Sequence, residues 1–103
     1  MLTRKQRMLN LLAGFAETYA LEPNWWMAYG QPCFAFRTTE QSAVEVLAKL
    51  VNYAMLESSM YILSHYLKGV ESNVSGVEEV LYFPGLPAPE DVDCFPEEVE
   101  YFA

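Results

Sequence analysis

The sequence predicts a mainly α-helical small domain of two to four helices, with at most a minor two-stranded β element. Its 103 residues, 52% of them hydrophobic and 15% aromatic, suit one self-supporting domain and not a disordered chain. Two long stretches, 3–21 and 38–69, repeat apolar residues at steps of three and four, as amphipathic helices do. Four of the six prolines lie between residues 84 and 96. Because proline breaks helices and interrupts ladders, no long helix or central strand is expected there.

The first expected helix opens the chain and ends before Pro23. Thr3 and Gln6 have the spacing of a capping box, and apolar residues follow at helical steps: Met8, Leu12, Phe15 and Tyr19. Its first turn carries three basic residues, Arg4, Lys5 and Arg7, which is unfavourable beside the positive end of a helix dipole. This cluster either marks a contact or lies on a frayed end in solvent.

An uncharged stretch, residues 23–36, follows the first helix. Pro23, Gly30 and Pro32 exclude a regular helix here. The adjacent Trp25 and Trp26 cannot share one face of a helix or strand. Either the segment buries both in the core, or one is displayed as an anchor for a partner, since tryptophan is enriched at interface hot spots. Residues 33–38 form a short strand or a buried coil.

The strongest helical pattern runs from Thr38 to Gly69. Thr38 and Gln41 repeat the capping-box spacing, and Gly69 stands where a C-terminal glycine is common. The spine consists of Val46, Leu50, Tyr53, Leu56, Met60, Leu63 and Leu67. One unbroken helix of about 30 residues would measure about 45 Å, longer than a globule of this size. The element therefore breaks near residues 57–59 into two antiparallel helices, or an oligomer buries its excess apolar surface.

A third capping-box spacing, Ser75 and Glu78, predicts a short helix over residues 76–83. The alternative is a strand over residues 78–83, which would pair with the strand near Cys33. The helical domain is expected to span residues 1–83, and residues 84–103 form an acidic tail rich in proline and aromatic residues.

Charge is distributed unevenly along the chain. The net charge is −8, yet residues 1–68 carry six bases and five acids, whereas residues 69–103 carry nine acids and no base. Such a field repels nucleic acid and acidic membranes and attracts a basic surface. We therefore expect a protein partner with a basic surface and no direct contact with nucleic acid or membrane. The expected partner-binding residues are Glu90, Asp91, Asp93, Phe95, Glu97, Glu98, Glu100, Tyr101 and Phe102, together with Trp25 and Trp26.

Three interpretations of this tail remain open. In the first, the tail binds a basic surface as a mimic of nucleic acid: its carboxylates lie on average about 6 Å apart along an extended chain, within a factor of two of the phosphate spacing of a nucleic-acid strand. The aromatic residues would anchor this contact. Alternatively, the aromatic residues dock on the protein's own core, with the acids facing Arg4, Lys5 and Arg7. The third interpretation is a disordered tail.

No catalytic or metal-binding pattern is present in the sequence. Cys33 and Cys94 lie 61 residues apart, a spacing that fits neither a disulfide framework nor a metal-ligand pair. A cysteine nucleophile paired with His65, the single histidine, has no support from the spacing. We expect no enzyme activity, no cofactor and no metal. Free thiols and the lack of an 18-residue apolar run or a convincing signal peptide indicate a cytoplasmic protein.

Together these features predict a non-enzymatic acidic binding protein that occupies a basic surface of its partner. Inhibition of a nucleic-acid-binding enzyme fits this chemistry. Phage-encoded inhibitors of restriction or CRISPR enzymes include small acidic chains of this kind, an analogy of composition that no motif strengthens. The alternative is an oligomeric scaffold or assembly subunit, such as a homodimer, with the apolar helix and residues 24–29 as its interface.

Overall fold

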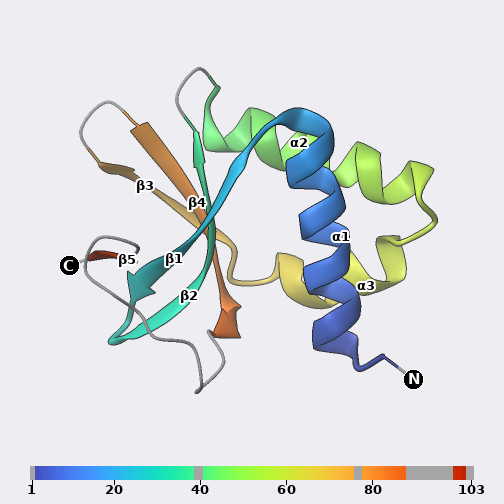
Figure 1. Ribbon diagram of the computed structural model, residues 1–103, viewed down its shortest axis with the longest axis horizontal. Helices are drawn as coiled ribbons and strands as arrows, with labels where there is room; N and C mark the ends of the chain where they lie inside the picture. The colour runs from blue at the N-terminus through green and yellow to red at the C-terminus, as the bar shows by residue number, and fades with distance from the viewer. Residues whose placement is uncertain (1, 39–40, 76–77, 88–98, 102–103) are drawn as a thin grey trace.

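The computed structural model describes residues 2–38, 41–75, 78–87 and 99–101. Three helices, α1 (Arg4–Tyr19), α2 (Ala43–Leu56) and α3 (Met60–Leu67), pack against one side of a five-stranded sheet (Figure 1). The strands are β1 (Glu22–Ala28), β2 (Gln31–Thr38), β3 (Glu71–Ser75), β4 (Glu78–Pro87) and β5 (Val99–Tyr101). The fold is α+β, so the prediction of a mainly helical domain with a minor two-stranded element is wrong.

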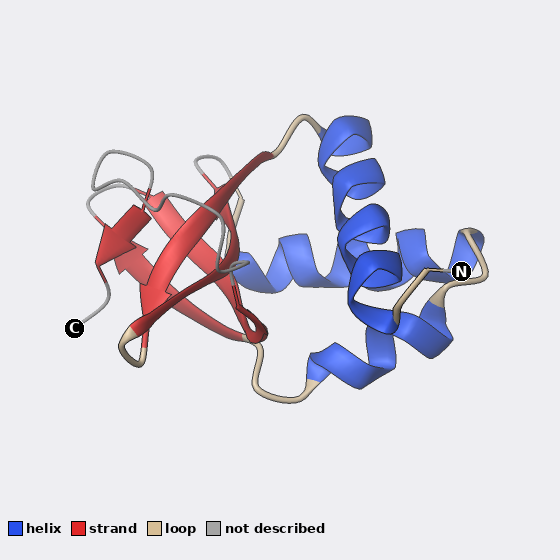
Figure 2. Cartoon of the chain, turned by 60° about the horizontal axis from the view of Figure 1, so that its bottom comes forward, coloured by secondary structure: helices blue, strands red, loops and turns tan. Residues whose placement is uncertain are grey.

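The sheet has the order β3-β4-β2-β1-β5. The first four strands pair antiparallel, and β5 pairs parallel with β1. Figure 2 shows the sheet at one end of the molecule and the helices at the other. Among the described residues, no helix has the length and apolar character needed to cross a membrane.

The β1–β2 hairpin replaces the irregular segment expected from the prolines. Tyr29 and Gly30 both have positive φ, 53° and 84°, as a two-residue turn of type I′ requires. In this hairpin the Ala28–Gln31 pair next to the turn is hydrogen-bonded, and hydrogen-bonded pairs then alternate with non-bonded ones along the ladder. The Pro23–Phe36 pair is one of the non-bonded pairs, so the Pro23 nitrogen points away from β2. The strand therefore loses no ladder bond at Pro23.

β4 confirms the strand alternative and excludes the short helix over residues 76–83. The strand also continues through Pro84 to Pro87, although a central strand was not expected there. Phe34 of β2 pairs with Phe83, whereas the preceding residue, Cys33, pairs with Pro87. The β4 residues between these two pairs, which begin with Pro84, have no partner on β2 and form a bulge. β4 thus crosses the expected domain boundary at residue 83. Residues 88–98 and 102–103 lie outside the described residues, and the division into two domains stays a prediction.

The helices follow the sequence pattern more closely. The Thr3–Gln6 capping box is present, with the Thr3 hydroxyl accepting from the Gln6 N–H at 3.1 Å. The long pattern breaks as expected after Leu56, where Ser58 takes a positive φ of 55°. The second capping box is wrong, because Ser42 caps α2 and Thr38 belongs to β2.

Two apolar clusters form the core, one on each face of the sheet. The larger lies between the helices and the sheet, with Phe15 of α1 and Leu50 of α2 against Phe36 and Phe83. The smaller consists of residues whose side chains alternate with these along the strands: Trp26, Ala28, Cys33, Ala35, Val80 and Tyr82. The central strands are therefore buried on both faces of the sheet.

Candidate functional site

The two tryptophans of β1 lie on opposite faces of the sheet. Trp26 is only 2% exposed and stacks on Tyr82, with ring centroids 6.3 Å apart. Trp25 is half-buried and meets the Phe34 ring edge-to-face at 6.0 Å, as part of the larger cluster. Trp26 is therefore a core residue, whereas the Trp25 side chain keeps part of its surface exposed.

The acidic C-terminal segment meets the sheet through β5. Its register places Val99 beside Trp25, Glu100 beside Trp26 and Tyr101 beside Met27. This backbone pairing agrees with docking of the segment's end on the chain's own fold. The other predicted tail residues lie outside the described residues: Glu90, Asp91, Asp93, Phe95, Glu97, Glu98 and Phe102. Of the basic cluster at the start of α1, Arg7 donates to the Tyr61 hydroxyl at 3.3 Å.

The fold converts the charge gradient of the sequence into a separation in space. The five strands carry five glutamates and one arginine, whereas the three helices carry four basic residues and two glutamates. Because the sheet and the helices occupy different ends of the molecule (Figure 2), the sheet end is acidic and the helical end is slightly basic. The two ends of the molecule therefore carry charge of opposite sign.

A carboxylate network spans the sheet on the face opposite the helices. Glu71 of β3 accepts hydrogen bonds from the Tyr29 and Tyr82 hydroxyls at 2.6 and 2.7 Å, both to its Oε2 atom. These hydrogen bonds hold the pKa of Glu71 below its ordinary value. The bond to Glu71 raises the pKa of Tyr29, and burial followed by the same carboxylate raises that of Tyr82. Glu71 is thus a fixed negative charge.

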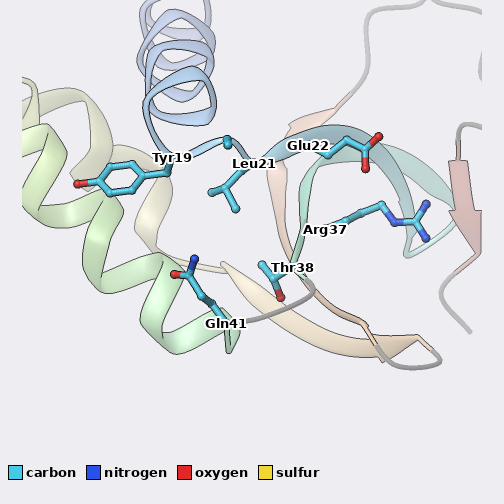
Figure 3. Close-up of a pocket in the computed structure, with 7 residues that line it drawn as sticks. Tyr19, Leu21, Glu22, Arg37, Thr38 and Gln41 are labelled. Carbon is cyan, nitrogen blue, oxygen red and sulfur yellow. The ribbon is translucent and has the colours of Figure 1, made fainter.

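A polar pocket of about 280 Å³ lies where α1 joins β1 (Figure 3). Its lining residues are Tyr19, Ala20, Leu21, Glu22, Arg37, Thr38 and Gln41. The Thr38 hydroxyl donates to the Glu79 carbonyl at 2.6 Å, and Gln41 accepts from the Lys49 ammonium at 2.6 Å. In Figure 3 the Glu22 and Arg37 side chains extend away from Tyr19. The lining thus offers one arginine, one glutamate and the neutral polar side chains of Tyr19, Thr38 and Gln41.

Of the residues considered for catalysis, the two that the structure describes, Cys33 and His65, are not brought together. Cys33 is buried in the smaller cluster, and burial raises the pKa of its thiol to about 11, which keeps it protonated at neutral pH. His65 is exposed on α3, among the helices. Cys94 lies outside the described residues. Within the described part of the chain, no three His, Cys, Asp or Glu side chains gather as metal ligands.

An apolar groove of about 180 Å³ lies between the start of α2 and β3. Its lining residues are Ala43, Val44, Leu47, Val70, Glu71, Ser72 and Leu81. Val44, at 76% exposure, and Val74 of β3, at 67%, are large apolar side chains left open to solvent near this edge of the sheet. An apolar groove beside an edge strand is a surface that extended peptides use.

Sequence reasoning missed the residues of the carboxylate network and of the groove. Tyr29 and Glu71 lie 42 positions apart and meet only because the sheet places β3 and the β1–β2 turn on one face. A partial signal exists in residues 78–83, where the strand alternative identifies the strand that carries Tyr82 but pairs it with the strand near Cys33 and not with Glu71.

No known family model matches the chain, and no curated protein or solved structure matches it either.

Proposed function

We propose that this protein is a non-enzymatic binding protein that places its acidic sheet end against a basic surface of a protein partner. The observation that carries the proposal is the charge separation, with five glutamates and one arginine on the strands. The adjoining residues 88–98 contribute five more acids and no base. Steering by such a field raises association rates and weakens as salt rises.

The partner in this proposal is an enzyme that holds nucleic acid in a basic groove, and binding inhibits that enzyme by occupying the groove. The predicted contact residues remain those of the C-terminal segment together with the partly exposed Trp25; the burial of Trp26 leaves it little surface for contact. The protein itself acts in the cytoplasm, where unpaired thiols such as Cys33 persist.

The test is affinity capture from a nuclease-treated lysate of the organism that encodes the protein. The binding variant carries Glu97→Lys, Glu98→Lys and Glu100→Lys. The matched control carries Glu17→Lys, Glu45→Lys and Glu57→Lys, which change the net charge equally on exposed positions at the helical end. Point substitutions are preferable to a truncation at Phe83, because β4 continues to Pro87.

We expect the wild-type chain and the control to retain a nucleic-acid enzyme that the binding variant loses. The purified enzyme should then release its nucleic acid when the wild-type chain is added, with an effect that weakens from low to high salt. Equal retention by both triple variants, each checked for folding by thermal melting, would contradict the proposal.

A second function, the oligomeric scaffold, is favoured by a different observation. Near the α2–α3 junction, Met55 and Leu56 are 61% and 85% exposed. Sedimentation over a range of concentrations tests this alternative. A scaffold gives an oligomer that resists salt and dissociates when Val51, half-buried on α2, is changed to glutamate; a monomer at all concentrations excludes it.

A further inference from the structure

The β3 strand presents an open edge. It pairs with β4 on one side, and no other strand in the described part of the chain pairs with its outer side. The Val74 N–H donates to the Asn73 side-chain oxygen at 2.9 Å, so it does not belong to the ladder with β4. Because ladder bonds alternate along an antiparallel strand, the Ser72 N–H faces outward as well. Two backbone N–H groups are therefore oriented toward a further strand.

Nothing in the β3 sequence protects this edge strongly. Edge strands commonly carry lysine or proline, which oppose pairing with another chain, and Glu71–Ser75 contains neither. The Asn73 side chain covers the Val74 N–H through a local bond that an incoming carbonyl can replace. The strand's short length and the Glu71 charge are the remaining protection.

The apolar groove continues this edge on the helical side of the sheet. Ser72 lies in the groove wall opposite Val44 and Leu47 of α2, and Val74 follows it on the same face of β3. A strand added at this edge would direct every second side chain into the groove. Apolar side chains fit there, because the walls contain Ala43, Val44, Leu47, Val70 and Leu81.

The opposite face of the same edge carries the Glu71 carboxylate, on the side of Val80 and Tyr82. Glu79 pairs with Val74 on the groove face, and residues 69–87 contain no basic residue. On an added strand, the side chains that point away from the groove would stand directly opposite Glu71, where an opposite charge stabilises a cross-strand pair. The two faces of the edge thus select two kinds of side chain in alternation.

We infer that the β3 edge and the α2–β3 groove bind an extended segment of the partner in which basic and apolar residues alternate. The inference rests on the proposed function and adds its binding mode, the addition of a strand to an existing sheet. Backbone hydrogen bonds from Ser72 and Val74 supply affinity, and the groove and Glu71 select the sequence.

Fluorescence anisotropy with a labelled seven-residue peptide of alternating lysine and valine tests this inference on the full chain. The control peptide has the same composition with its lysines and valines in two blocks. We expect the alternating peptide to bind at least about tenfold more tightly, a factor that corresponds to about 1.4 kcal/mol. Equal binding of the two peptides would show charge attraction alone and overturn the inference.

A pair of variants locates the site. Val44→Lys places a positive charge in the groove, whereas Met55→Lys adds the same charge at the exposed far end of α2. We expect the first to weaken the alternating peptide about tenfold and the second to change its affinity less than about twofold. Equal effects of the two substitutions would contradict this location.

Amide NMR separates this site from other outcomes. Peptide binding should shift the Ser72 and Val74 amide signals most strongly and slow their hydrogen exchange. If β3 instead pairs with β3 of a second copy, these amides become protected as protein concentration rises without peptide, and the inference fails. If the peptide leaves them unchanged while the tail charge reversal still abolishes partner capture, the inference fails and the proposed function stands.

Discussion

Replacing Phe36 with alanine should remove the centre of the larger cluster. Phe36 lies on central strand β2, is fully buried, and has aromatic neighbours Phe34, Phe15 and Phe83 at centroid distances of 5.1, 5.7 and 6.2 Å. Phenylalanine-to-alanine changes in cores cost about 3–5 kcal/mol, and three edge-on ring contacts place this site well within that range. We expect a loss of about 4 kcal/mol, a large share of the roughly 5–15 kcal/mol typical of a whole domain.

Urea unfolding followed by tryptophan fluorescence measures this loss. With a slope of about 1.3 kcal/mol/M, typical of small domains, the midpoint should fall by about 3 M. Met55→Ala, at an exposed position on α2, is the control and should change stability by less than about 0.5 kcal/mol. A loss below about 1.5 kcal/mol for Phe36→Ala with an unchanged slope would refute the reasoning that this aromatic cluster forms the centre of the core.

Two further predictions concern protonation. The Cys33 thiol ionises near pH 9 when unfolded but near pH 11 when buried, so the unfolded state loses its proton first and stability falls as pH rises between these values, by up to about 1.4 kcal/mol per pH unit. Urea unfolding at pH 7 to 10.5 should show this fall, and Cys33→Ala should reduce it; an identical fall in the variant would count against the assignment. The pKa of Glu71 is lower in the folded state than in the unfolded state. Its contribution to the free energy of unfolding is therefore fully present above the ordinary glutamate pKa and is lost as pH falls through the folded value. Carboxyl NMR titration should show the Glu71 midpoint rising in Tyr29→Phe, and an unmoved midpoint would exclude the Tyr29 hydrogen bond as a cause.

Local signals predicted the helical end of the molecule well. The capping box at Thr3 is made entirely by residues three positions apart, so tertiary structure was not needed to find it. The break after Leu56 was one of the two alternatives that size left open, because one continuous helix would not fit a globule of this length unless an oligomer buried its excess surface. Leu56 was expected in the core but is exposed. It is the last residue of α2, so the apolar face of that helix does not continue beyond it.

The sheet was underpredicted because its central strands are covered on both faces. Phe34, Ala35 and Phe36 are consecutive and all buried, so β2 shows no alternation of apolar and polar residues. Such runs cannot be distinguished from buried helix or coil by periodicity alone. Proline was also read too strictly, because Pro23 has its nitrogen turned away from the ladder and Pro84 lies in a bulge.

The sequence predicts the acid excess of the candidate site but not the strand order that arranges it. Composition alone indicated an acidic surface, since every residue after Lys68 that carries charge is an acid. The role of β3 as an open edge depends on strand order, which brings together residues far apart in the sequence. No local pattern in Glu71–Ser75 carries that information.

The central claim, that the acidic sheet end meets a basic partner, can be tested before any partner is known. The measurement is an NMR titration of the isotope-labelled full chain with an oligoarginine peptide at low salt, repeated at high salt. We expect the largest amide shifts in β3, β4 and β5, small shifts in α1 and α2, and their disappearance at high salt. Shifts concentrated on the helices, or scattered evenly over both ends of the molecule, would contradict the claim.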